Sequence, residues 1–146
     1  MNDNERIAIR LRRAVLAAAI FSMIGLAGPA LADEITVALS GNQEIPPVTT
    51  SATGTGTLTI GPDKSISGKV TVSGINVTMA HIHEASSGAN GPVTIPLTKT
   101  SENVWAVPTG VKLTDAQFDA YKAGRLYFNI HSEAYRSGEI RGQIKP

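Results

Sequence analysis

The sequence predicts an all-β domain, an antiparallel Greek-key-like β-sandwich or barrel with one short helix. Short segments in which β-branched residues alternate with small or polar residues support this, and so do the Gly, Pro and Asn residues that separate them. Only one segment has the signals of a helix, so strands and helices do not alternate as in proteins built on a parallel sheet. This domain spans residues 33–146, and residues 1–32 have a different character.

The predicted strands follow from the positions of these breaks. Two of them flank the turn Gly61–Lys64 and should form a hairpin. The intervening loops include Gly41–Pro47, where consecutive prolines cannot donate ladder hydrogen bonds, together with Ser86–Pro92 and Ser132–Gly138. The predicted strands are Ile35–Leu39, Thr53–Ile60, Ser65–Val72, Met79–His83, Val93–Leu97, Asn103–Val107, Arg125–His131 and Glu139–Lys145.

The helix is predicted from its two ends. Thr114 is a suitable N-cap, and Gln117 three residues later completes a capping box. Phe118 and Tyr121 then give an apolar stripe, and Gly124 has the residue type that ends helices in a left-handed conformation. We expect a helix of two to three turns.

The first 32 residues have the pattern of a secretory signal peptide. Four arginines up to Arg13 precede an apolar core, and Ala30 and Ala32 form the small-x-small pattern at which signal peptidase cleaves. An uncleaved membrane anchor is the alternative, but a spanning helix needs about 20 apolar residues, and this core is shorter. We therefore expect cleavage after Ala32, no membrane span in the mature chain, and a periplasmic or secreted protein.

Charge and cysteine content exclude several function classes. The whole chain has thirteen Lys and Arg against twelve Asp and Glu, and the first 32 residues hold four of the basic and two of the acidic residues. The remainder is therefore close to one negative charge, which argues against a nucleic-acid partner, because phosphate binding needs a concentrated basic surface. The chain has no cysteine, so disulfides and thiol chemistry are excluded.

The three histidines are the candidate functional residues. His81 and His83 are two residues apart in a predicted strand, so their side chains share one face and Ile82 lies on the other. His131 ends a second predicted strand, on the face opposite Phe128. If these strands pair, three imidazoles can converge on one copper or zinc ion. The alternative is that the histidines face solvent or make ordinary hydrogen bonds.

The same alternation predicts the faces on which other polar side chains lie. In the last predicted strand it buries Ile140 and Ile144 and turns Glu139, Arg141 and Gln143 outward. If this strand and the strand of His131 pair with the strand of His81, we expect Glu84 or Glu139 near the histidines. No serine lies in a Gly-x-Ser-x-Gly sequence, and no catalytic nucleophile beside a base is evident. The sequence therefore identifies no catalytic residues.

A family resemblance rests on several segments of the chain. They are Leu39–Pro47, Ala80–His83, Gly91–Val93, Leu126–His131 and Gly138–Ile144. Together they resemble the CHRD domain, first recognised in chordin and common in exported bacterial proteins, over roughly Glu34–Lys145. The resemblance implies an extracytoplasmic module, since chordin is an extracellular antagonist of growth factors. One departure is Glu84–Ser86, where the family often has Gly-Pro.

A second, more distant resemblance concerns the histidines alone. By order and context, His81, His83 and His131 resemble three copper ligands of copper-zinc superoxide dismutase, whereas the metal-bridging histidine, the zinc ligands and the disulfide cysteines are missing. This resemblance implies at most one ion, copper more than zinc, bound or stored rather than used in catalysis.

Two hypotheses remain. The chain is an exported, non-enzymatic binding or structural module of the cell envelope with a protein or envelope partner. Alternatively, it is a mononuclear metal-binding protein whose three-histidine site could carry redox chemistry.

Overall fold

The structure, a computed structural model, describes residues 33–146, and the predicted signal peptide lies outside the described residues. The described residues contain nine strands, a 3₁₀ turn η1 (Gly41–Gln43) and an α-helix α2 (Asp115–Lys122). The strands are β1 (Glu34–Ser40), β2 (Thr53–Ile60), β3 (Ile66–Ser73), β4 (Val77–Glu84), β5 (Val93–Pro96), β6 (Thr98–Ser101), β7 (Val104–Ala106), β8 (Leu126–Ser132) and β9 (Ile140–Ile144).

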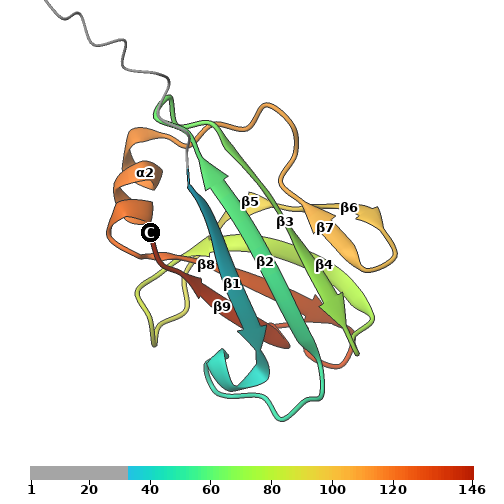
Figure 1. The fold of residues 1–146 in the computed structure, drawn as a ribbon. Coiled ribbons are helices and arrows are strands. Elements are labelled where there is room, and N and C mark those ends of the chain that lie inside the picture. Colours follow the sequence, from blue (N-terminus) through green and yellow to red (C-terminus); the bar gives the residue numbers. More distant parts are fainter. Residues whose placement is uncertain (1–32) are drawn as a thin grey trace, which may run out of the picture. The chain divides into compact units, whose positions relative to one another are not determined.

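All nine strands belong to one antiparallel sheet in the order β5-β4-β8-β9-β1-β2-β3-β7-β6. The sheet folds back on itself, so that β1, β2 and β3 form one layer and β4, β8 and β9 lie behind them (Figure 1). Because β1 pairs with both β2 and β9, it joins the two layers along one side. The all-β, barrel-like prediction with one short helix is confirmed.

The core fills the space between the two layers. It contains Leu58, Val70, Ile82, Phe128 and Ile140, each fully buried. These residues come from strands of both layers, as period-two alternation requires when each strand has one apolar face. A glycine makes room for the largest of them: a Cβ at position 56 of β2 would lie 2.7 Å from the Phe128 ring.

The predicted helix and its capping box are present. Thr114 Oγ1 accepts a hydrogen bond from the Gln117 backbone N–H at 3.2 Å, and the Thr114 N–H donates to Gln117 Oε1 at 2.9 Å. Gly124 has a φ of 66°, the left-handed conformation expected after the last turn. Of the helix residues, Ala120 is the most deeply buried, and Phe118 and Tyr121 pack against the core from its margin.

The sequence missed one strand and misplaced some ends. β6 was not predicted because all four of its residues are exposed, so it has no alternation of apolar and polar residues. β4 begins two residues earlier than expected, and Glu139 lies outside β9. The predicted loop 41–47 begins with the turn η1.

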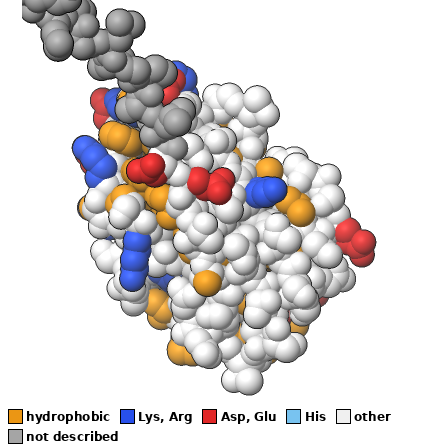
Figure 2. Space-filling model, in the orientation of Figure 1, with side chains coloured by type: hydrophobic (Ala, Val, Ile, Leu, Met, Phe, Trp, Pro, Cys, Tyr) orange, Lys and Arg blue, Asp and Glu red, His pale blue; other side chains and the backbone are white. Residues whose placement is uncertain are grey.

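Charged side chains on the face drawn in Figure 2 are scattered among uncharged ones, with both signs represented. Within residues 33–146, no helix is long and apolar enough to cross a membrane.

Candidate metal centre

The structure brings the three histidines together on the outer face of β4 and β8. These strands pair with His81 opposite Asn129, His83 opposite Tyr127 and Met79 opposite His131. Each histidine offers one ring nitrogen, and these nitrogens all lie within 4.8 Å of one another. The shortest separation joins His81 Nδ1 and His131 Nε2, which are 3.1 Å apart.

Backbone carbonyl groups fix the tautomers of two of the rings. His83 Nδ1 lies 2.9 Å from the Gly91 oxygen, and His131 Nδ1 lies 2.9 Å from the Arg136 oxygen. A carbonyl oxygen only accepts hydrogen bonds, so both Nδ1 atoms carry the proton and donate it. In the neutral rings, Nε2 is then left with a lone pair. This is the arrangement by which carbonyl groups orient metal-binding histidines.

Burial keeps the rings in the neutral form that binds metals. The pKa of His81 is lowered to about 4, chiefly by burial and also by neighbouring His131 and His83. Burial is also the main cause of the lowered pKa values of His83 and His131, which the carbonyl hydrogen bonds oppose. At neutral pH the cluster is therefore uncharged and has lone pairs available.

One of these lone pairs has no partner. His83 Nε2 is buried and makes no hydrogen bond with any described residue, which costs free energy unless another group occupies the space. The 3.1 Å separation of His81 and His131 is close to the roughly 3.3 Å between neighbouring ligands of a tetrahedral ion at about 2.0 Å. Ring movements of about 1 Å would bring all three nitrogens to such an ion.

The His83 ring is stacked on the ring of Tyr127, and Tyr127 in turn contacts Arg141. The centroid of the His83 ring lies 5.1 Å from the centroid of the Tyr127 ring, and the two ring planes differ by 17°. The guanidinium carbon of Arg141 lies 3.5 Å from the centroid of the Tyr127 ring. Tyr127 also accepts a hydrogen bond from the Gly91 N–H at 3.1 Å through its hydroxyl oxygen. Gly91 therefore contacts both rings: its carbonyl oxygen accepts from His83, and its N–H donates to Tyr127.

The prediction that Glu139 and Arg141 face outward is wrong. Arg141 is 2% exposed and Glu139 is 7% exposed. Both are on the predicted face, but loops cover it: Arg141 donates to Asn90 in the loop after β4, and Thr50 in the loop before β2 donates to Glu139 at 2.7 Å. Alternation predicts the side of a sheet, and it does not predict whether a loop lies on that side.

Glu84 and Glu139, which were expected near the histidines, do not join the cluster. Glu84 lies 3.6 Å from Arg125, and Glu139 accepts hydrogen bonds from Thr50 and Ser132. Among the described residues, the grouping at this site contains only the three histidines. The site therefore offers nitrogen ligands without a carboxylate.

A buried acid that was not predicted from the sequence lies beside the site. Glu44 follows the turn η1, is 5% exposed and accepts a hydrogen bond from Asn129 Nδ2 at 2.8 Å. Burial raises its pKa to about 7, although Asn129 and Arg141 both act to lower it. The only sequence signal was its place between Gln43 and two prolines, which is typical of a loop.

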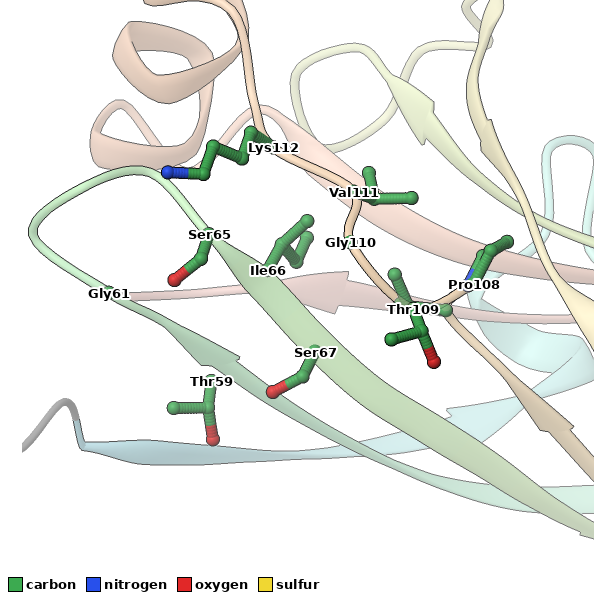
Figure 3. Close-up of a pocket in the computed structure, with 11 residues that line it drawn as sticks. Thr59, Gly61, Ser65, Ile66, Ser67, Pro108, Thr109, Gly110, Val111 and Lys112 are labelled. Carbon is green, nitrogen blue, oxygen red and sulfur yellow. The ribbon is translucent and has the colours of Figure 1, made fainter.

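A hollow of about 420 Å³ lies elsewhere, between β3 and the segment that leads to the helix (Figure 3). Thr59, Ser65, Ser67 and Thr109 contribute hydroxyl groups to it, and Lys112 lies at one end. It shares no residue with the histidine cluster, and within residues 33–146 no histidine, carboxylate or aromatic ring lines it.

Fold and site together define a small antiparallel β-module that carries a partly buried histidine cluster on one face of two neighbouring strands. The model of the CHRD domain matches residues 35–144, so the chain belongs to the CHRD family, as the sequence resemblance predicted. No curated protein and no solved structure matches this chain. The likeness of the histidines to the copper ligands of superoxide dismutase therefore stays a resemblance.

Proposed function

We propose that this chain is an exported CHRD module that binds one metal ion, copper in preference to zinc, through His81, His83 and His131. The main support is the orientation of His83. Its Nδ1 is held by the Gly91 carbonyl group, and its Nε2 is buried with no hydrogen-bond partner among residues 33–146. A metal ion would satisfy that lone pair.

The donor set favours copper. The cluster offers three imidazole nitrogens and no carboxylate oxygen. Imidazole suits copper and zinc alike, and copper(II) is the more tightly bound of the two at a given nitrogen site. His81 and His83 are only partly buried, whereas His131 is 5% exposed. An ion held there would be reached from the side of His81 and His83, away from His131.

Export is part of the proposal because of the first 32 residues. Their arginines, apolar core and Ala-x-Ala end are typical of a signal peptide. The protein would then act in the periplasm or outside the cell.

The test is metal titration of the mature protein, purified without an affinity tag after expression of the full chain. We expect one copper ion per chain, tighter than zinc, and a mature N-terminus at Asp33. Each of His81→Ala, His83→Ala and His131→Ala should weaken binding by about 10-fold or more, since each removes one of three ligands. Lys99→Ala, an exposed residue of β6, is the matched control and should bind as the wild type does.

The alternative is a CHRD module that holds a protein or envelope partner and no metal. It predicts that wild-type protein binds no copper, or that copper binding is unchanged in all three histidine variants. Either result would overturn the metal-site proposal and direct the search to partner proteins.

A further inference from the structure

We infer that Met79 supplies a fourth ligand, its thioether sulfur, and that the site therefore favours copper(I) over zinc. This inference rests on the proposed function, since it assigns the remaining ligand of the same site. It comes from the position, exposure and chemistry of one side chain.

The strand register places Met79 beside the cluster. Met79 lies two residues before His81 in β4, so both side chains are on the same face of the sheet. It is also directly opposite His131 in β8, and residues opposite each other in an antiparallel pair have Cβ atoms about 4.5–5.5 Å apart. Met79 is thus next to two of the three histidines.

The exposure of Met79 sets it apart from its neighbours on this face. It is 46% exposed, whereas His131 opposite it is 5% exposed. No packing requirement explains a methionine at a position where nearly half of the side chain meets solvent, because the core lies on the other side of β4 with Ala80 and Ile82. Its three rotatable bonds allow the sulfur to turn toward the histidines.

The chemistry of the thioether decides which ion benefits. A thioether is a soft, uncharged ligand that suits copper(I), whereas zinc in proteins is held by thiolate, imidazole and carboxylate groups. Three neutral imidazoles and one thioether carry no negative charge, so they suit an ion of low charge. A zinc ion would use the three nitrogens and a water molecule in the fourth position, as zinc sites with three protein ligands do.

The composition of the chain makes this inference easy to test. The methionines are Met1, Met23 and Met79, and there is no cysteine, so residues 33–146 contain a single sulfur atom. In the mature protein, prepared in sulfur-free buffer, a sulfur neighbour of bound copper can come from no other residue.

The experiment compares wild type with Met79→Leu, a variant of similar size at an exposed position. Copper(I) affinity is measured by competition with a chromophoric chelator, and zinc affinity by titration. We expect Met79→Leu to weaken copper(I) binding by about 10–100-fold and to change zinc binding by less than about twofold. X-ray absorption of the copper(I)-loaded wild type should show one sulfur neighbour, absent in Met79→Leu.

The outcomes separate this inference from the proposed function. If wild type binds copper but shows no sulfur neighbour, and Met79→Leu has the same copper(I) affinity, the methionine inference is wrong and the three-histidine site stands. If wild type binds no metal at all, the proposed function itself is wrong, and the inference falls with it.

Discussion

Glu44 is a buried carboxyl group whose pKa burial raises to about 7. Its ordinary pKa is 4.5, so between about pH 4.5 and 7 the folded chain holds a proton that the unfolded chain has lost. The free energy of unfolding should therefore fall as pH rises through this window, by about 3 kcal/mol for a shift of this size. The glutamine in Glu44→Gln has no titratable carboxyl group, so we expect the free energy of unfolding of this variant to fall less over the same pH range.

Urea unfolding of wild type and Glu44→Gln at pH 5 and pH 8 measures the effect. Asn129 and Arg141 face the carboxyl group and act against the shift in its pKa, and the histidines, whose pKa values are lowered, give a slope of opposite sign below about pH 6.5. Glu102→Gln, at an exposed residue, is the control. An equal pH dependence in wild type and Glu44→Gln would show that Glu44 is ionised in the folded protein throughout.

At this scale, alternation along strands predicted which side chains share a face and did not predict their environment. His81 and His83 lie on one face with His131 because each strand has period two and these two strands pair. Arg141 lies on that face as well, yet it is buried under the loop that contains Asn90. The path of a loop across a sheet depends on tertiary contacts, and a local pattern does not contain them.

Strand β8 is the element on which both the core and the site depend. It pairs with β4 on one side and β9 on the other, and all seven of its residues are buried. Phe128 points into the core while His131 belongs to the cluster on the opposite face. Phe128→Ala should lower the free energy of unfolding by about 3–5 kcal/mol, because the cavity next to Gly56 cannot close fully.

Chemical denaturation of the variant checks this value. Phe118→Ala on the helix is a matched control, since that ring is only partly buried at the margin of the core, and we expect it to cost less. A loss below about 1 kcal/mol for Phe128→Ala would mean that the face assignment of β8, and with it the placement of His131, is wrong.

Elements with strong local signals were predicted and those without were missed. The helix has a capping box at Thr114 and a left-handed glycine at Gly124, and both are found in the structure. The short strand β6 is fully exposed and polar, so it forms only because β7 offers it hydrogen bonds. Such an edge strand depends on hydrogen bonds to its neighbour, so its own residues show no pattern from which it can be predicted.

For the whole molecule, a metal ion at this site would join strands that are distant along the chain. His81 and His131 are 50 residues apart in sequence and lie on adjacent strands. The complete ligand set exists only in the folded chain, so an ion that binds it stabilises the fold by about 4 kcal/mol when its free concentration is 1,000 times Kd. We expect Tm to rise with copper concentration, as differential scanning calorimetry can measure.

The size of the rise in Tm distinguishes a site that exists only in the folded chain from a site formed by residues that are neighbours in sequence. His81 and His83 are close in sequence and can hold an ion even in the unfolded chain, which would reduce the stabilisation. His131→Ala leaves that pair intact and removes the ligand that only folding brings near. We therefore expect copper to raise Tm much less in His131→Ala than in wild type, and an equal rise in both would mean that His131 does not bind the ion.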